Sequence, residues 1–233
     1  MKWLLIVALL AVSSCAPLPG AQSDARIVML GDSVFAWWRG SGRSVGDALA
    51  ENLNRPVANF SISAARISQP NPAMQFTRLQ IDNQFDRRAA DWIVVNGGAN
   101  DLYFECLCLS CDGEIDQLVA SDVTTGEIPA FLTQLRATGA QVMYVGYHRS
   151  GGLGGPYDRC TSRLDRVEDR LAQFAGQTDG IHFADMSDVF PPRDRSYYDG
   201  DLIHPSVKGS AAIGARIATL IQAHTGTPKD PIP

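Results

Sequence analysis

The sequence predicts one α/β domain in which helices cover both faces of a parallel β-sheet. The chain has 233 residues, and 45% of them are hydrophobic, which is enough for one domain with a full core. Strands of a parallel sheet are buried on both faces and therefore read as continuous apolar runs. Such runs alternate along this chain with stretches of helical periodicity, and no internal repeat divides it into two domains.

Five short apolar runs have the composition of strands: Arg26–Leu30, Val57–Ile62, Trp92–Val95, Val142–Tyr147 and Ile181–Ala184. Between them, apolar residues recur near a 3.6-residue period, most clearly over Leu164–Phe174 and Ile213–Ile221. We also expect helices over Val45–Leu53, Ala73–Phe85 and Ile115–Leu135, the last broken near Thr124–Gly126 and Pro129. The glycine-rich stretches Gly40–Gly46 and Gly151–Gly155 are predicted to be flexible loops.

The N-terminal residues have the pattern of an export signal. Lys2 precedes an apolar run of ten residues, Trp3–Val12, which is too short to span a bilayer. The run ends in Val12-Ser13-Ser14-Cys15, which resembles the lipobox of bacterial lipoproteins. We therefore expect residues 1–14 to be a signal peptide and Cys15 to carry a lipid anchor on a tether reaching residue 25. A plain secretory signal, giving a soluble periplasmic protein, is the alternative.

The charge of the chain argues against a nucleic-acid partner. The formal net charge is −5 at pH 7, and no basic run interrupts the sequence. Proteins that bind nucleic acid usually carry a basic patch or stripe. We therefore expect no nucleic-acid partner.

Four further cysteines fit an exported protein. Cys106, Cys108 and Cys111 lie close together, and Cys160 follows about fifty residues later. In an oxidising compartment these four form two disulfides, with three possible pairings. The alternative is a zinc site with four thiolate ligands. We favour the disulfides and expect Leu102–Gly113 to form a stapled loop at the rim of a cleft.

Polar segments follow the predicted strands at the edge where ligands bind in parallel α/β folds. They are Gly31-Asp32-Ser33, Asn59–Ala64, Gly97–Asp101 and Asp201–His204. Alone, each could be a turn or a helix cap. Together they supply the parts of a hydrolytic site. A serine hydroxyl needs a base, a histidine can accept its proton, and a carboxylate can orient that histidine.

These four segments resemble blocks I, II, III and V of the SGNH (GDSL) hydrolase family, over nearly the whole chain after the signal. The resemblance implies a flavodoxin-like three-layer α/β/α sandwich with a five-stranded parallel sheet over residues 26–225, followed by a flexible tail at 226–233. It implies hydrolysis of carboxylic esters or thioesters without a metal or other cofactor. The substrate would be a small-molecule, lipid or glycan ester.

The resemblance also implies roles for individual residues. Ser33 would be the nucleophile, His204 its base and Asp201 the orienting carboxylate. The backbone N–H groups of Ser33 and Ala64 and the side-chain N–H of Asn100 would bind the oxyanion. The family usually has Gly where this chain has Ala64, so the added methyl is expected to narrow the pocket or strain the turn.

Asp32 and Asp101, beside these residues, are expected to brace their turns. His148 follows the fourth strand, and we expect either a loop residue or part of the cleft lining. Trp37 and Trp38 could form a wall for acyl groups or rings, or pack in the core. Gly42-Arg43-Ser44-Val45-Gly46 matches the nucleophile-elbow pattern, but no strand precedes it. We therefore expect Ser44 to cap the next helix.

Two other functions remain open. The same site could transfer an acyl or acetyl group to a sugar or cell-envelope hydroxyl, or remove O-acetyl groups from envelope polysaccharide. A binding module with a degenerate site is the alternative from another class. The complete set of base, orienting group and oxyanion donor argues for an enzyme.

Overall fold

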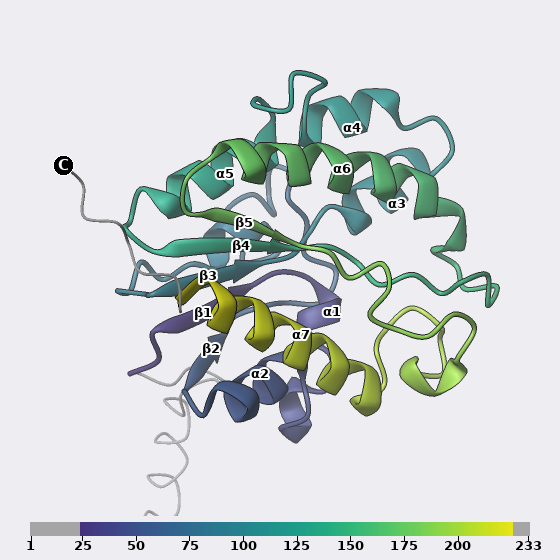
Figure 1. Cartoon of the computed structure of the whole chain (residues 1–233). Helices are drawn as coiled ribbons and strands as arrows, with labels where there is room; N and C mark the ends of the chain where they lie inside the picture. Colours follow the sequence, from purple (N-terminus) through teal and green to yellow (C-terminus); the bar gives the residue numbers. More distant parts are fainter. Residues whose placement is uncertain (1–23, 226–233) are drawn as a thin grey trace, which may run out of the picture.

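The computed structural model describes residues 24–225 (Figure 1). The signal peptide, the lipidation site Cys15, nearly all of the tether and the tail at 226–233 therefore lie outside the described residues. Within residues 24–225, no helix has the length and apolar character needed to cross a membrane.

The centre of the fold is a five-stranded sheet in which every pairing is parallel. Its strands lie in the order β2-β1-β3-β4-β5. Their bounds are β1 Ile27–Leu30, β2 Val57–Asn59, β3 Trp92–Val95, β4 Gln141–Val145 and β5 Ile181–Ala184. All five predicted strands are confirmed, although β2 and β4 end before the predicted Ile62 and Tyr147. Tyr147, which follows the shortened β4, lines the cavity described below.

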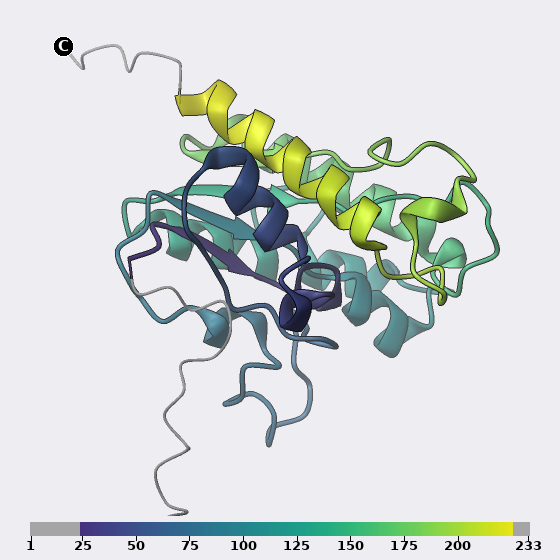
Figure 2. The same ribbon diagram turned by 90° about the horizontal axis from the view of Figure 1, so that it is seen from below.

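Helices cover both faces of the sheet, as predicted (Figures 1 and 2). One face carries α1, α2 and α7, and the other carries α3, α4, α5 and α6. The α-helices are α1 Ser33–Ala36, α2 Val45–Leu53, α3 Ala99–Cys106, α4 Asp112–Leu118, α5 Glu127–Arg136, α6 Thr161–Gln177 and α7 Val207–Thr225. Short 3₁₀ helices lie at η1 Arg39–Ser41, η2 Ile81–Gln84, η3 Asp158–Cys160 and η4 Arg195–Tyr197.

Helices α2 and α7 lie side by side on their face of the sheet (Figure 2). Gly214 of α7 makes this close approach possible. A Cβ at that position would lie 2.6 Å from Cβ of Ala48 and 2.9 Å from the backbone of Leu49. Strands β1 and β3 at the centre of the sheet are wholly buried, as their continuous apolar runs require.

The prediction of a helix over Ala73–Phe85 is wrong. The segment forms turns, and only η2 at Ile81–Gln84 is helical. The amide of Asn83 donates to the carbonyl groups of Gln75 and Thr77, so a side chain satisfies backbone groups that a helix would have paired. Phe76 is 90% exposed, so its ring does not anchor the segment to the core.

The stretch Ile115–Leu135 divides into α4 and α5, and the break predicted at Thr124–Gly126 is confirmed. The predicted break at Pro129 is wrong. Pro129 lies in the first turn of α5, where a backbone N–H has no intrahelical partner to lose. The loops expected at Leu102–Gly113 and Gly40–Gly46 are also partly helical, because α3 runs to Cys106 and both η1 and α2 enter the second stretch.

Ser44 is the N-cap of α2, as predicted. Its Oγ accepts the N–H of Asp47, and the Asp47 carboxylate accepts the N–H of Ser44 at 2.8 Å, which completes a capping box. Ser44 follows the 3₁₀ turn η1 and Gly42, not a strand. It therefore does not occupy a nucleophile elbow.

Removing this cap is expected to weaken the fold. Ser44→Ala should lower the free energy of unfolding by about 0.5–2 kcal/mol, because the backbone N–H of Asp47 in the first turn of α2 loses the hydroxyl that accepts it. Urea denaturation measures the change. The matched control is Ser187→Ala, an exposed turn serine whose hydroxyl forms no hydrogen bond within the described residues. Equal stability of the two variants would contradict the capping role.

Candidate active site

A cavity of about 260 Å³ opens at the carboxyl edge of the sheet. Ser33, Ala64, Asn100 and His204 all line it. It lies beyond β1 and β3, where successive connections leave in opposite directions because β2 flanks β1 on one side and β3 on the other. This reversal of strand order is the usual ligand position in an open parallel sheet. Four of the predicted site residues thus share one cavity.

Ser33 is the first residue of α1, directly after β1 and the buried Asp32. Asp32 is the N-cap of this helix, and its Oδ1 accepts the N–H of Val34 at 2.9 Å. Its Oδ2 accepts the hydroxyl of Tyr147 at 2.6 Å. Burial raises the pKa of Asp32, although the hydrogen bonds from Tyr147 and Val34 oppose that rise. The carboxyl group fixes the turn that carries Ser33, which is the bracing role expected of Asp32.

His204 is held by Asp201 from the same loop. Oδ2 of Asp201 lies 2.5 Å from Nδ1 of His204, and its Oδ1 accepts the backbone N–H groups of Ile203 and His204 at 3.0 Å each. Burial acts to raise the pKa of Asp201, but these hydrogen bonds outweigh it and the pKa is lowered. Asp201 is therefore a carboxylate, Nδ1 of His204 carries the proton, and Nε2 is left as an acceptor.

Asn100 lies in the first turn of α3, and both ends of its amide are oriented. Nδ2 donates to the carbonyl of Ala65 at 3.0 Å, and Oδ1 accepts the hydroxyl of Tyr157 at 2.9 Å. These contacts determine which end of the amide is the donor. The second N–H of Nδ2 has no protein acceptor within the described part of the chain.

Two backbone donors complete this edge of the cavity. The N–H groups of Ser33 and Ala64 have no acceptor among residues 24–225. Ala64 has a φ of 63°, so it adopts the left-handed conformation that favours glycine, as expected for a strained turn. Asp101 holds the following segment by accepting the N–H groups of Ile67 and Ser68, and burial raises its pKa to about 7.

Ser33 and His204 face the same cavity without a direct hydrogen bond. Among the described residues, neither Oγ of Ser33 nor Nε2 of His204 has a hydrogen-bond partner. Hydrogen bonds between catalytic groups are often long in unliganded sites and tighten when substrate binds. Convergence at one sheet edge is thus observed, whereas the serine–histidine hydrogen bond is not formed in this structure.

Two aromatic side chains make contacts in this site that the sequence did not predict. Tyr157 orients Asn100, which lies 57 positions earlier, and no local pattern signals that contact. Trp37 was expected either to form a substrate wall or to pack in the core. It lines the cavity and also stacks on His204, with ring centroids 3.7 Å apart and planes inclined by 3°. Trp38 instead donates its indole N–H to the carbonyl of Pro205.

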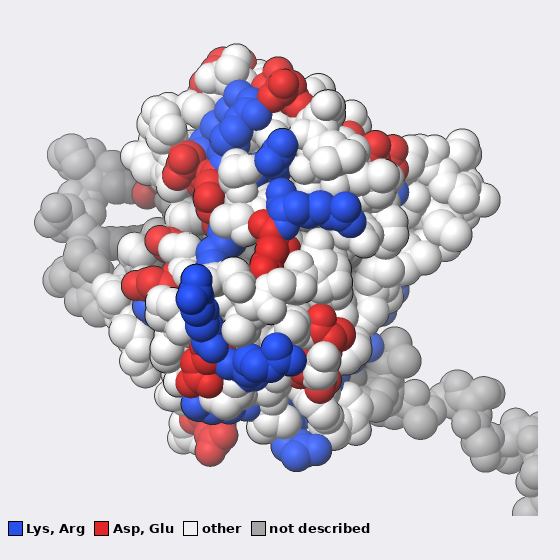
Figure 3. Space-filling view, turned by 90° about the vertical axis from the view of Figure 1, so that its right-hand side faces the viewer, with Lys and Arg blue, Asp and Glu red and all other residues white. Residues whose placement is uncertain are grey.

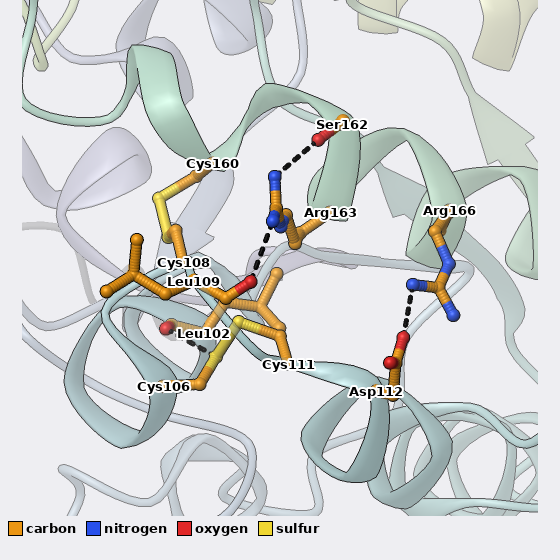
Figure 4. Close-up of a disulfide and its surroundings, with 10 residues drawn as sticks. All are labelled: Leu102, Cys106, Cys108, Leu109, Cys111, Asp112, Cys160, Ser162, Arg163 and Arg166. Carbon is orange, nitrogen blue, oxygen red and sulfur yellow. Dashed lines mark hydrogen bonds and ion pairs between the residues drawn. A yellow bond between two sulfur atoms is a disulfide. The ribbon is translucent and has the colours of Figure 1, made fainter.

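The four described cysteines pair as Cys106–Cys111 and Cys108–Cys160, with Cα–Cα distances of 5.3 and 4.9 Å (Figure 4). The four sulfurs therefore form the two disulfides that we favoured over the alternative zinc site. Cys160 ends η3, between the cavity-lining Tyr157 and Thr161. The second disulfide thus ties the end of α3 to the wall of the cavity. In the described part of the chain, no cluster of three or more His, Cys, Asp and Glu side chains is arranged to hold a metal ion.

His148 lines the cavity, one of the two positions expected for it. Its Nε2 lies 3.0 Å from the carbonyl oxygen of Ile203, so the N–H donates to the loop that carries His204. Burial lowers the pKa of His148 to about 4. The imidazole is therefore neutral at pH 7 and helps to hold that loop.

The depressed pKa of His148 predicts a pH dependence of stability. Between about pH 6.5 and about pH 4, the unfolded chain binds a proton on this histidine that the folded protein does not. Stability should therefore fall as the pH falls through this window, by no more than about 1.4 kcal/mol per pH unit for this group. His148→Gln should reduce the slope, measured by urea denaturation at pH 4.5, 5.5 and 7.

The comparison includes His182→Gln, because burial also lowers the pKa of His182 to about 4. His182 lies on β5 and does not line the cavity. Each variant should reduce the slope, and the double variant should reduce it further. A slope for His148→Gln equal to that of the unsubstituted protein would contradict the assignment.

Structures similar to this one come from hydrolases of several kinds. A family-two carbohydrate esterase from Clostridium thermocellum, in complex with cellohexaose, is 18% identical with a TM-score of 0.58, and the match covers 91% of this chain and 66% of that one. A lipase from a goat rumen metagenome is 21% identical with a TM-score of 0.54, covering 84% and 96%. A protein described as an SGNH hydrolase, from Slackia heliotrinireducens, is 21% identical with a TM-score of 0.56, covering 84% and 98%. These likenesses show the shared fold.

Sequence comparison gives the family. No functionally curated protein matches the chain. The profile of the GDSL-like lipase/acylhydrolase family matches residues 29–212, from β1 into α7. That span includes every predicted catalytic and oxyanion-binding residue from Ser33 to His204. On this match, the chain belongs to the GDSL-like lipase/acylhydrolase family, the SGNH hydrolases.

Proposed function

We propose that this protein is a serine esterase that cleaves carboxylic esters through an acyl-enzyme on Ser33. One observation carries the proposal. Ser33, His204 and the oriented amide of Asn100 share one cavity. Asp201 holds the Nδ1 edge of the imidazole, and Nε2 has no hydrogen-bond partner among residues 24–225. Nucleophile, base, orienting group and oxyanion donor are the parts that acyl transfer requires.

The proposed reaction has two halves. As Oγ of Ser33 attacks the ester carbonyl carbon, its proton passes to Nε2 of His204, and the Asp201 carboxylate stabilises the resulting imidazolium. The imidazolium then protonates the departing alkoxide, and the alcohol leaves an acyl group on Ser33. Water attacks this acyl group with the same proton relay and releases the free acid.

The oxyanion of each tetrahedral intermediate would lie against three donors. These are the backbone N–H groups of Ser33 and Ala64, which have no acceptor in the described chain, and the free N–H of Asn100. Because the donors are oriented before substrate binds, they stabilise charge without reorganising. A backbone donor does not depend on its own side chain, so Ala64 can fill a place usually held by glycine.

The cavity favours an uncharged acyl group. Tyr157, Leu164, Leu202 and Ile203 contribute apolar surface to its lining. Arg149, which also lines the cavity, is paired with both Glu168 and Asp165 and is not available to a ligand carboxylate. On the face at the carboxyl end of the sheet, basic and acidic side chains are interspersed (Figure 3), a pattern that does not concentrate one sign of charge around the entrance.

A second candidate keeps the same site but changes the acceptor. The structural neighbours include a carbohydrate esterase with a bound cello-oligosaccharide as well as a lipase. We therefore include removal of O-acetyl groups from envelope polysaccharide, and acyl transfer to a sugar hydroxyl, among the reactions to be tested. A panel of short-chain, long-chain and acetylated-sugar esters distinguishes the substrates. Free acid release measured against transfer to added sugars distinguishes hydrolysis from transfer.

We also propose that the protein is exported and held at the periplasmic face of a bacterial membrane through Cys15. The lipobox-like Val12-Ser13-Ser14-Cys15 supports this location. Two disulfides in a small domain suit an oxidising compartment, which also supports export.

Three substitutions test the catalytic proposal. Ser33→Ala should remove nearly all turnover and all labelling by a fluorophosphonate, because the attacking oxygen is lost. Asn100→Ala should lower kcat by about 10²–10³, because one oxyanion donor is lost. Ser44→Ala is the matched serine control and should keep kcat and KM. Steady-state kinetics on a short-chain p-nitrophenyl ester measures all three. Normal turnover by Ser33→Ala would overturn the proposal.

Localisation is tested separately. Cys15→Ser should abolish incorporation of a radiolabelled fatty acid into the protein, because no thiol remains to carry the lipid. Immunoprecipitation from labelled cells measures the incorporation, and esterase activity should be unchanged. An unsubstituted protein that takes up no label would contradict the anchor.

A further inference from the structure

Trp37 connects the helix that carries Ser33 to the loop that carries His204. It is the C-cap of α1, and its backbone N–H donates to the carbonyl of Ser33 at 2.8 Å. Its indole lies flat on the imidazole of His204, with ring centroids 3.7 Å apart. One residue thus contacts the backbone of the proposed nucleophile and the ring of the proposed base.

The indole is itself held in place. Its Nε1–H donates to Oδ2 of Asp199 at 2.7 Å. The backbone N–H of Asp199 donates to the carbonyl of His204 at 2.8 Å. Trp37, Asp199 and His204 therefore form a closed set of contacts. Neighbouring Trp38 adds a second connection, because its indole N–H donates to the carbonyl of Pro205 at 3.0 Å.

The imidazole needs such support. Its only side-chain hydrogen bond within the described residues joins Nδ1 to Asp201, and a ring held at one atom can still tilt about that contact. The stacked indole restricts this tilt because the two planes are inclined by only 3°. Small errors in the placement of a catalytic group can cost about 10²-fold in rate.

We propose that Trp37 is a positioning residue for the reaction, and the inference rests on the esterase function proposed above. The stack holds the imidazole plane so that Nε2 remains directed into the cavity beside Ser33. Through its link to α1, it also couples the position of the base to that of the nucleophile. Asp199 acts through Trp37 by fixing the indole.

The stack should matter most after proton transfer. When His204 accepts the serine proton it becomes an imidazolium, and the face of an indole attracts a cation more strongly than a neutral ring. The contact is therefore stronger in the charged transition state than in the resting enzyme. An interaction of this kind raises kcat and leaves KM nearly unchanged.

Two substitutions at one position test this role. Trp37→Leu removes the aromatic face and should lower kcat by about 10–100-fold, with KM changed less than about threefold. Trp37→Phe keeps an aromatic face against His204 and should recover most of the loss. The rate of fluorophosphonate labelling of Ser33 should follow kcat in both variants. Thermal unfolding confirms that each protein is folded at the assay temperature.

Several results would overturn the inference. A raised KM with unchanged kcat in Trp37→Leu would make Trp37 a substrate wall, and equal losses in the Leu and Phe variants would exclude a role for the stacked ring. Should Trp37→Leu fail to fold, Trp37→Met is the substitute, because its longer and more flexible side chain can adapt to the space left by the indole without supplying a ring. Activity of Trp37→Met equal to that of Trp37→Phe would then contradict a role for the stacked ring.

The two proposals fail in different ways. An inactive Ser33→Ala together with a fully active Trp37→Leu would contradict the positioning role of Trp37 and leave the esterase proposal intact. An active Ser33→Ala would remove the esterase mechanism itself. Asp199→Ala provides an independent check, because it frees the indole but keeps the ring. Asp199→Ala should lower kcat less than Trp37→Leu does. A larger loss would contradict the proposal that Asp199 acts through Trp37.

Discussion

The hydrogen bond between Asp201 and Nδ1 of His204 is the contact on which the proposed chemistry of the cavity depends. It places the imidazole proton on Nδ1 and leaves Nε2 as the acceptor that the proposed mechanism requires. Both residues lie in one short loop, so a neighbouring element must set the position of that loop relative to Ser33. Trp37 stacks on the ring, and His148 donates to the carbonyl of Ile203.

Sequence patterns were sufficient for the sheet and for the segments that follow its strands. Strands buried on both faces must be continuously apolar, and parallel strands end at one edge, so Ser33, Ala64, Asn100 and His204 could be expected to meet. The contacts between distant segments could not be predicted. Tyr157 touches Asn100, and Trp37 touches His204, only because the fold brings separate segments together. The prediction of a helix over Ala73–Phe85 was wrong for another reason. Side-chain hydrogen bonds there take the place of the backbone hydrogen bonds of a helix, and periodicity does not reveal them.

Ala64 shows how the fold tolerates a departure from the family pattern. A left-handed conformation costs a residue with a Cβ about 1–2 kcal/mol relative to glycine. The surrounding structure holds the turn, since Asp101 accepts the N–H groups of Ile67 and Ser68 just beyond it. Such strain persists where neighbouring contacts over-determine the backbone, and it often marks functional sites. The N–H of Ala64 remains without an acceptor in the described chain, as an oxyanion donor requires.

The most direct measurement is a crystal structure of the protein after reaction with an alkyl phosphonate, which imitates the tetrahedral intermediate. The account predicts phosphorus bonded to Oγ of Ser33. One phosphonyl oxygen should lie within hydrogen-bond distance of the N–H groups of Ser33 and Ala64 and of Nδ2 of Asn100, with Nε2 of His204 beside the serine oxygen. An adduct on another residue, or one on Ser33 whose oxygen points away from these donors, would contradict it.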